Sequence, residues 1–451
     1  MGDLSGPLTI KPEWLSADHG PPEVRSTSAL LSIVIGDGIA TRAEDDWSGS
    51  VHPWVRLSAY PLALWFAGSW WRLLSEPAPE STRRSLSWRM AHEATAAGGG
   101  FLWPSLAFEP DGENVEVVCR ASGAASTEPV RYLSTFRKLV PVGEFERAME
   151  EFINLPIERL NRDGIRDTAL HSLWTEVQEE RKAPGLAKYR RLEAILGYEP
   201  GEGPEGVARD LEQLGAEIGE GAMLQLASAC AGEDAASSLN LVRDFSKTHG
   251  VEGHIAPTAA LRALDVLRCT NAPQKPAPWR RGWELAEAAR EVWNLRPEPL
   301  DDKNLSELLG MESKALVEGT APAQNAFVSL AIRRRSAEEV TLLFRKRNRP
   351  GRRFEAARFL ADHLIAPSAD RWLPATDAKT ARQKIQRAFA AEFMCPIAWL
   401  QAELGGNFSN EAIEDAAERS GVSPLAVRSH LANNGLISPE EVTIGEVTVA
   451  A

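Results

Sequence analysis

Short apolar runs separated by glycine and proline dominate the first part of the chain. Leu30–Ile35 (LLSIVI) is rich in β-branched residues and ends at a Gly-Asp-Gly turn, so it predicts a strand. Leu106–Phe108 and Val115–Cys119 flank an Asp-Gly turn and predict a β-hairpin. Residues 62–73 instead repeat their apolar side chains every three or four positions, which predicts a helix. This mixture indicates an α+β domain over residues 1–141.

Tryptophans gather in this first domain, where eight of the fourteen lie within the first 103 residues. Trp70 and Trp71 are neighbours on the predicted helix and cannot point both rings at one core, so we expect one of them at a surface or a domain interface. His92-Glu93 begins like a zinc-binding helix, but Ala96 stands at the second histidine position. A structural role is therefore expected for His92.

The pattern becomes helical after the first domain. Phe145 and Met149 mark one apolar face, and similar spacings continue along the chain, which predicts a helical middle domain over residues 142–271. Within it, the stretch His249–His254 contains glycines and predicts a loop with solvated histidines. The sequence NAPQKPAP at Asn271–Pro278 has three prolines in eight residues and no periodicity, so it predicts a linker.

The segment after the linker, residues 278–437, combines helices with strands. Ala326–Arg333 and Val340–Phe344 contain alternating apolar residues and predict two strands. A long helix is expected to begin at Thr376-Asp377, and residues 438–451 are expected to form a tail. The whole chain is therefore predicted to be α+β and mostly helical.

Two short helices are predicted to close this segment, over residues 410–420 and 424–434, with Ser423 as the N-cap of the second. The second carries side chains able to meet base edges or phosphates, so the pair can be a DNA-binding helix-turn-helix. These side chains are Arg428, Ser429, His430, Asn433 and Asn434. The first helix is acidic, which favours the alternative that the pair packs into the domain's own helical bundle.

Composition describes an ordinary globular protein. Its 451 residues, 43% hydrophobic and 25% charged, are enough for several domains with their own cores. The four cysteines, Cys119, Cys230, Cys269 and Cys395, lack C-x-x-C spacing and are expected to be buried thiols in a reducing compartment. The sequence shows neither a signal peptide nor an apolar run of membrane-spanning length, so we expect a cytoplasmic protein without a membrane partner.

The stretch RRFEAARFLADH contains R-F-x-x-A at Arg353–Ala357, and a second phrase, FAAEFMCP, follows at Phe389–Pro396. Together with the order of opening helix, two strands and closing helix pair, these phrases resemble the ImmA/IrrE family of metallopeptidase-like proteins over residues 278–437. The resemblance implies a zinc-dependent endopeptidase fold. It also implies a bacterial protein, because the family is typically bacterial. Its members often cleave regulators or act in stress responses and mobile-element control.

The zinc ligands that the resemblance implies are missing. In the family, two histidines four residues apart bind the metal, and the glutamate after the first is the general base. Here Arg358 and Asp362 stand at the histidine positions, Phe359 stands at the base, and Gln383 replaces the carboxylate that is the third ligand. A guanidinium has no lone pair for a metal, and a phenyl ring accepts no proton. We predict a pseudopeptidase with no metal and no other cofactor, in which Arg358 and Asp362 can bridge each other.

A basic stretch interrupts this acidic chain, whose net charge is −13. Nine cations fall within 21 residues: Arg333, Arg334, Arg335, Arg345, Lys346, Arg347, Arg349, Arg352 and Arg353. If the two predicted strands form a hairpin, these cations can make one patch that contacts phosphates or an acidic partner. The alternative is a solvated face, or a set of partners for the chain's own acidic helices.

The leading functional hypothesis is a non-catalytic adaptor or regulatory subunit that binds a protein partner in a bacterial stress response or in defence against mobile elements. It rests on a scaffold kept without its chemistry, and on tryptophans suited to anchoring an interface. The alternative is a nucleic-acid-binding regulator, or a subunit of a nucleoprotein complex, that uses the basic stretch, the closing helix pair or both. An enzyme of another class within residues 1–140 has no motif in its favour.

Overall fold

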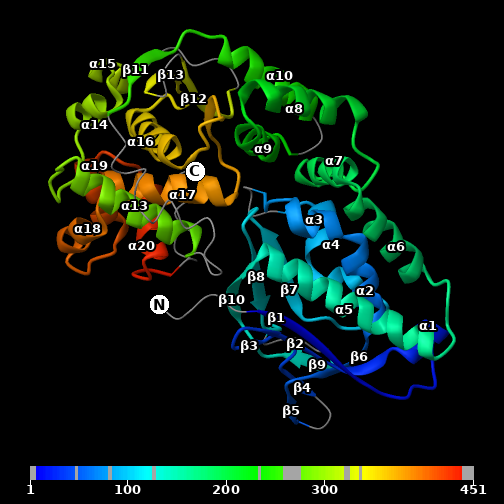
Figure 1. Ribbon diagram of the computed structural model, residues 1–451. Helices are drawn as coiled ribbons and strands as arrows, with labels where there is room; N and C mark the ends of the chain where they lie inside the picture. The colour runs from blue at the N-terminus through cyan, green and yellow to red at the C-terminus, as the bar shows by residue number, and fades with distance from the viewer. Residues whose placement is uncertain are drawn as a thin grey trace. The chain divides into compact units, whose positions relative to one another are not determined.

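The computed structural model describes residues 7–45, 49–79, 84–123, 128–231, 235–256, 276–318, 326–334 and 338–438 (Figure 1). It is an α+β protein and mostly helical, as the sequence predicts. The chain divides into two compact units, Gly2–Ala208 and Arg209–Ala451, called the N-terminal unit and the C-terminal unit below. All the strand pairings in the described ranges are antiparallel.

Three small sheets form the β part of the N-terminal unit. One has the order β1-β2-β3 with β6 also paired to β2, the second is β10-β8-β7 and the third is β5-β4-β9. The strands are β1 (Leu8–Trp14), β2 (Ser28–Ile35), β3 (Gly38–Ile39), β4 (Ala43–Asp45), β5 (Val51–His52), β6 (Val55–Ser58), β7 (Ser105–Pro110), β8 (Asn114–Arg120), β9 (Val130–Tyr132) and β10 (Phe136–Pro141). The predicted strand at Leu30–Ile35 lies in β2, and β7 and β8 form the predicted hairpin.

Helices complete this unit. They are α1 (Pro22–Ser26), α2 (Ala59–Gly68), α3 (Trp70–Ser75), α4 (Leu86–His92), the 3-10 helix η1 (Ala94–Ala97), α5 (Val142–Arg162), α6 (Ala169–Lys182) and α7 (Pro184–Ile195). The helix predicted over residues 62–73 is divided into α2 and α3 at Ser69. Pro156 lies inside α5, whose apolar face includes Phe145 and Met149, as predicted.

Both neighbouring tryptophans are buried, so neither ring lies at the surface, which is one of the two places expected for one of them. Trp70 packs edge-on against Trp174, with the ring centroids 5.0 Å apart. The Nε1 of Trp71 donates a hydrogen bond to Glu180 at 2.6 Å. Helix α6 packs against α2, and α7 packs against α3, so the consecutive helices α2 and α3 are covered on more than one face. A core on two faces accommodates two neighbouring rings.

The division between the units falls within α8 (Glu205–Ile218), inside the segment predicted as a helical middle domain. Helix α5, at the start of that segment, packs against α2 and β1 and contributes Phe145 and Met149 to the N-terminal core. The segment therefore contributes helices to both units. The sequence could not show this division, because the apolar face of a helix does not say which core the helix joins. Most of the predicted linker, residues 271–275, lies outside the described ranges.

A four-stranded sheet of order β11-β13-β12-β14 organises the C-terminal unit. Its strands are β11 (Val251–His254), β12 (Ser329–Arg333), β13 (Glu339–Leu343) and β14 (Trp372–Ala375). The two central strands are the predicted ones, and they pair as a hairpin. The loop predicted for His249–His254 is wrong, because its last four residues form β11, although both histidines are exposed. Glycines hide this strand from a pattern search, since they carry no alternating side chains.

The helices of the C-terminal unit begin with α8 and surround this sheet. They are α9 (Glu220–Ala229), α10 (Ala235–Ser246), α13 (Pro278–Val292), α14 (Asp302–Leu309), α15 (Ser313–Val317), α16 (Arg349–Ile365), α17 (Ala381–Met394), α18 (Ile397–Leu404), α19 (Asn410–Ser420) and α20 (Pro424–Asn433). Helix α17 packs against both α13 and α16, and α16 packs against β12 and β14 (Figure 1).

The long helix predicted from Thr376-Asp377 begins later, at Ala381. Thr380 is its N-cap, and the Thr380 hydroxyl accepts a hydrogen bond from the Gln383 amide. The closing helices α19 and α20 match their predicted ranges to within one residue. Ser423 caps α20 as expected, with its hydroxyl accepting from the Ala426 amide at 3.2 Å.

Candidate functional site

Helix α16 carries Arg358 and Asp362, which the ImmA/IrrE resemblance would align with the first and second zinc ligands, and α17 carries Gln383, which it would align with the third; these are called the first, second and third ligand positions below. Asn348 caps α16, because its Oδ1 accepts a hydrogen bond from the Gly351 amide at 2.7 Å. Packed between the sheet and α17, the middle of α16 is shielded from water. Arg358, Phe359 and Asp362 are each at most 3% exposed. The two polar side chains therefore need hydrogen-bond partners inside the fold.

Arg358, at the first ligand position, is bound to neutral acceptors. Its Nη2 donates to the Thr376 carbonyl at 2.5 Å and to Oε1 of Gln383, the residue at the third ligand position. The Gln383 Oε1 also accepts from the Thr376 amide at 2.9 Å, and its Nε2 donates to the Pro374 carbonyl at 2.9 Å. Burial, joined by the nearby Arg387 cation, lowers the pKa of Arg358 to about 9. The guanidinium therefore still carries its charge at pH 7.

Asp362, at the second ligand position, is bound by Arg382. Its two oxygens accept from Arg382 Nε at 2.6 Å and Nη2 at 2.8 Å, and Nη1 of the same guanidinium donates to Asp370 at 2.5 Å. The predicted bridge between Arg358 and Asp362 is therefore wrong, because a bidentate partner from α17 satisfies both oxygens at once. Burial lowers the pKa of Arg382, but Asp362 and Asp370 outweigh it and raise that pKa overall.

Helix α9 adds further hydrogen bonds to this polar cluster. The Gln225 Oε1 accepts from the Thr380 hydroxyl at 2.5 Å and from the Gln383 Nε2 at 3.2 Å. The close approach of α9 to Asp370 depends on glycine, since a Cβ on Gly221 would lie 2.5 Å from an oxygen of Asp370. Helix α9 also packs against β14, the outer strand of the sheet. The third ligand position is thus enclosed by side chains from α9, α16 and α17.

These residues do not fit a metal ion. Among the described residues there is no group of three or more His, Cys, Asp or Glu side chains that could hold one. Both oxygens of Asp362 already bind Arg382, and the Arg358 cation lies at the first ligand position. A divalent cation placed here would meet a buried positive charge instead of a ligand.

Much of the basic stretch is used inside the C-terminal unit. Arg345 is typical, because its Nε donates to Glu355 at 3.1 Å and its Nη2 donates to Asp377 at 2.5 Å. Its side chain is only 8% exposed. Three further members of the stretch are buried and donate to backbone carbonyls: Arg333, Arg352 and Arg353. These four arginines hold the fold together and leave few donors for an outside ligand.

The remaining cations of the stretch lie at the surface. Arg334 and Arg349 are exposed but pair with Glu252 and Asp302. Two others, Lys346 and Arg347, are exposed and form no ion pair in the described part of the chain, although the charge of Lys346 helps to lower the pKa of Asp377. Arg335 lies outside the described residues. The prediction of one continuous basic patch therefore reduces to a smaller exposed group.

The polar side chains of the closing helix pair turn largely inward. Arg428 is buried and its Nη2 donates to Asn410 at 2.7 Å. His430 is buried too, with its Nε2 3.0 Å from Glu392, while Asn433 is exposed. Helix α20 packs against α17 and α19. This arrangement favours packing within the bundle over readout of DNA bases.

His92 lies in a buried polar network of the N-terminal unit. Its Nδ1 is 2.9 Å from the Phe108 carbonyl, its Nε2 is 2.9 Å from Glu76, and its ring stacks on Trp88. Arg72 donates to the same Glu76 oxygen at 2.6 Å. Burial raises the pKa of Glu76, but His92 and Arg72 outweigh burial and lower that pKa overall. These contacts agree with the structural role expected for His92.

Three described cysteines are chemically quiet. Cys119, Cys230 and Cys395 are buried, and burial raises the pKa of each thiol to about 12. At neutral pH the reactive thiolate is therefore rare. Cys269 lies outside the described residues.

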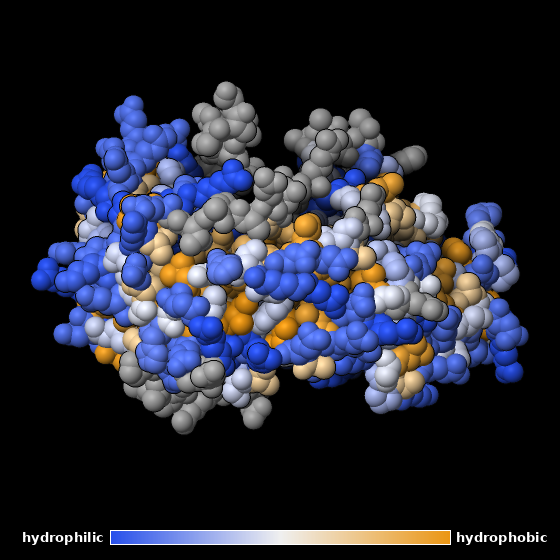
Figure 2. Space-filling model, turned by 90° about the horizontal axis from the view of Figure 1, so that it is seen from above, coloured by the Kyte–Doolittle hydropathy of each residue, from blue (hydrophilic) through white to orange (hydrophobic). Residues whose placement is uncertain are grey.

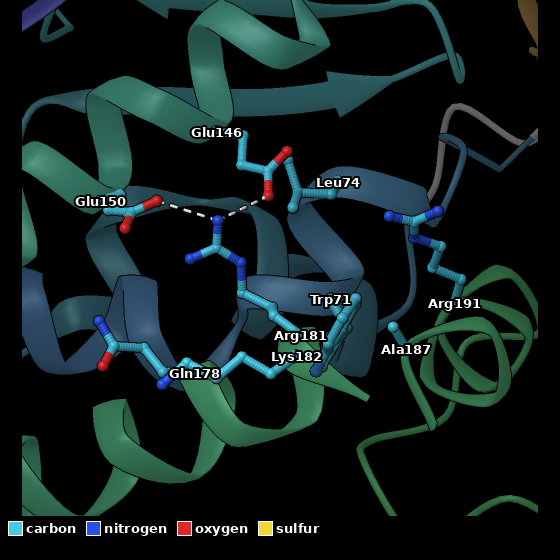
Figure 3. Close-up of a pocket in the computed structure, with 9 residues that line it drawn as sticks. All are labelled: Trp71, Leu74, Glu146, Glu150, Gln178, Arg181, Lys182, Ala187 and Arg191. Carbon is cyan, nitrogen blue, oxygen red and sulfur yellow. Dashed lines mark hydrogen bonds and ion pairs between the residues drawn. The ribbon is translucent and has the colours of Figure 1, made fainter. Parts of the chain in front are cut away.

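A pocket of about 460 Å³ in the N-terminal unit gathers polar side chains that the sequence pattern does not single out (Figure 3). Helices α3, α5, α6 and α7 line it with Trp71, Leu74, Glu146, Glu150, Gln178, Arg181, Lys182, Ala187 and Arg191. The Arg181 guanidinium lies 4.7 Å from the centroid of the Trp70 ring. Helical spacing places Glu146 and Glu150 on one face of α5, but only tertiary packing brings α7 beside them.

The tryptophans considered as interface anchors are mainly core residues. Trp88 and Trp103 are buried, as are the neighbours Trp70 and Trp71 on α3. On α4, by contrast, Leu86 is 72% exposed and Met90 is 53% exposed. In the face shown in Figure 2, hydrophilic residues cover much of the surface and hydrophobic residues gather in smaller areas between them. Scattered apolar residues of this kind are normal on soluble proteins.

Comparison with known proteins finds no match for this chain among family models, curated proteins or solved structures. The ImmA/IrrE resemblance accordingly rests on the sequence phrases and the order of elements given above. In the described ranges, no helix is both long and apolar enough to span a membrane.

Proposed function

We propose that the chain is a non-catalytic adaptor or regulatory subunit built on an inactive ImmA/IrrE-like peptidase scaffold. It binds a protein partner in a bacterial stress response or in defence against mobile elements. The observation that carries this proposal is the buried hydrogen bond from Arg358 to Gln383, which joins the first and third ligand positions to each other. A site that merely lacked a metal would leave its polar groups unpaired, whereas here Arg358 Nη2 and both oxygens of Asp362 are hydrogen-bonded, although Arg358 Nε has no partner among the described residues.

The charge distribution supports a protein partner over nucleic acid. The chain carries a net charge of −13, three arginines of the basic stretch are buried, and a fourth, Arg345, has a side chain that is only 8% exposed. The nucleic-acid alternative now depends mainly on Lys346 and Arg347, which offer two phosphate contacts rather than nine. The nucleic-acid alternative predicts that reversing both charges abolishes salt-sensitive nucleic-acid binding, whereas the adaptor proposal predicts that binding of a protein partner stays intact.

The first test is native mass spectrometry of the chain purified gently from its own host, with zinc and nucleic acid measured in the same sample. A protein companion at defined stoichiometry, without stoichiometric zinc, is the expected result. Stoichiometric zinc together with zinc-dependent cleavage of a companion would overturn the proposal. A nucleic-acid companion in place of a protein would favour the alternative.

A second test asks whether the scaffold is the one that the resemblance implies. The substitutions Arg358→His, Phe359→Glu, Asp362→His and Gln383→Glu restore the family's ligands and base, and the combined variant is compared with the unaltered chain. If the scaffold is right, the folded variant takes up one zinc ion and the unaltered chain takes up none. A variant with native circular dichroism that binds no zinc would contradict the assignment of these positions.

A further inference from the structure

Residues 209–229, which are most of α8 together with α9, pack against the outer strand β14 of the C-terminal sheet and are called the cover below. The Ile218 carbonyl accepts a hydrogen bond at 2.7 Å from the amide of Arg371, the residue before β14. The Gln225 Oε1 accepts from the Thr380 hydroxyl and from the Gln383 Nε2, as described above. These three contacts are polar, and in each of them the cover supplies the acceptor.

The apolar residues of the cover are packed separately from the main cores. Met223 on α9 faces α8, because a Cβ on Gly215 would lie 3.5 Å from the Met223 methyl carbon. Five buried apolar residues of the cover belong to neither of the two large apolar cores in the described part of the chain: Leu211, Leu214, Ile218, Met223 and Leu226. Loss of apolar burial opposes the opening of a packed interface, whereas hydrogen bonds can be exchanged for bonds to water with a small net loss. These features favour separation of the cover from the sheet as a unit.

Two glycines determine how closely the cover approaches the sheet. A Cβ on Gly219 would lie 2.5 Å from the Asp370 Cα, and a Cβ on Gly221 would lie 2.5 Å from the Asp370 Oδ2. Asp370 is 1% exposed, and the same Oδ2 accepts from Arg382 at 2.5 Å, so this carboxylate cannot move aside without breaking its ion pair. The closed position of the cover therefore depends on the absence of two side chains.

The groups beneath the cover have other partners that do not depend on it. Gln383 is also bound to α16 and to the chain around β14, and Asp370 is bound to Arg382. If the cover moves away, three donors are left without their acceptors: the Arg371 amide, the Thr380 hydroxyl and the Gln383 Nε2. Donors that are held in place by a folded sheet and helix fit the carbonyl or amide oxygens of a protein partner, because little ordering is needed on binding.

We propose that the cover is a movable autoinhibitory element. When it is closed, its own carbonyl and amide oxygens occupy the three donors; when it opens, the donors bind carbonyl or amide oxygens of the protein partner. The identity of the ligand as a protein rests on the adaptor function proposed above. The movement itself does not, because it follows from contacts within the C-terminal unit.

Hydrogen exchange of the full chain, resolved at single amides, tests the movement without any partner. The Arg371 amide reports opening directly, since its acceptor, the Ile218 carbonyl, belongs to the cover. This amide is expected to exchange at least about 100-fold faster than the most protected amides of β12 and β13, which require unfolding of the sheet. Exchange of the Arg371 amide at the same rate as those amides would overturn the proposal.

Gly221→Ala should open the cover. Alanine stabilises a helix relative to glycine, so helix propensity alone would strengthen α9. The clash with Asp370 should instead speed exchange of the Arg371 amide at least about ten-fold, with exchange in β12 and β13 unchanged. Gly215→Ala is the matched control, because it is the same substitution within the cover but its Cβ makes an ordinary contact with Met223.

Gln225→Ala gives a second variant, which removes an acceptor of the cover without adding a clash. It should speed exchange of the Arg371 amide by a smaller factor than Gly221→Ala and by a larger one than Gly215→Ala. Equal exchange at Arg371 in all three variants, or an equal increase throughout the sheet in Gly221→Ala, would show that the cover does not move as a separate unit.

Native mass spectrometry of Gly221→Ala and Gly215→Ala, purified in parallel from the host, tests the autoinhibition. Occupancy by a protein companion should be at least about two-fold higher in Gly221→Ala, because apparent affinity rises with the fraction of binding-competent chains. Equal occupancy in the two variants would overturn the autoinhibitory role. If the unaltered chain also lacks a companion, the adaptor function fails as well, whereas a companion on the unaltered chain confines the failure to the cover.

Discussion

The polar cluster around α16 and the pocket between α5, α6 and α7 use similar residues for different purposes. Each contains arginine, glutamine and two carboxylates, yet the first is closed and the second is open. In the cluster, Asp362 binds Arg382 through both oxygens; in the pocket, Glu146 and Glu150 each use only one. The difference teaches that residue type alone does not mark a binding site. Polar groups left without partners in a solvent-accessible pocket are a better sign of a binding site.

The strongest way to break this comparison is to open the closed cluster. Arg382→Met leaves the carboxylates of Asp362 and Asp370 buried without their cation. We expect the free energy of unfolding of the C-terminal unit to fall by about 3–5 kcal/mol, as for other broken buried ion pairs. Urea denaturation, monitored by hydrogen exchange of the amides in α16 and α17, measures this loss of unfolding free energy. A loss below about 1 kcal/mol would mean that water reaches this cluster and that it is not closed.

A buried network in the N-terminal unit gives the next largest effect, and it depends on pH. The folded-state pKa of Glu76 is lowered, so Glu76 stabilises the fold above its ordinary pKa of 4.5 and this contribution is lost as the pH falls through the lowered value. Glu76→Gln should cost about 1.5–3 kcal/mol at pH 7, the range for hydrogen bonds to a charged group. In thermal unfolding from pH 7 to pH 3, the difference between Glu76→Gln and the unaltered chain should shrink below pH 4.5. A difference that stays constant would contradict this assignment.

A smaller effect is expected at Arg358, although this residue is also fully enclosed. Its partners are the neutral acceptors Thr376 and Gln383, and burial opposes its charge, as its lowered pKa records. Arg358→Met removes the cost of a buried cation together with its hydrogen bonds, so we expect a change in unfolding free energy of about 1 kcal/mol or less. The same denaturation experiment should therefore rank it well below Arg382→Met. An equal loss in the two variants would show that Arg358 contributes as much as a full ion pair.

The sequence predicted the parts of this fold that depend on local periodicity. The strand at Leu30–Ile35, the central hairpin of the C-terminal sheet and the closing helices follow their side-chain spacing. It did not predict β11, whose glycine interrupts the alternation, or the burial of both Trp70 and Trp71, which needs two packed faces. The partners of Arg358 and Asp362 could not be predicted either, because α17 supplies them from another part of the chain. Tertiary contacts of this kind leave no mark in local spacing.

The smallest effect is expected where the comparison began, at the open pocket. Lys182 is exposed and has no acidic partner among the described residues, so Lys182→Gln should change the unfolding free energy by less than about 0.5 kcal/mol. Thermal unfolding of the unaltered chain and the variant measures this. A loss as large as that expected for Arg382→Met would mean that the fold depends on Lys182, contrary to the distinction between the closed cluster and the open pocket.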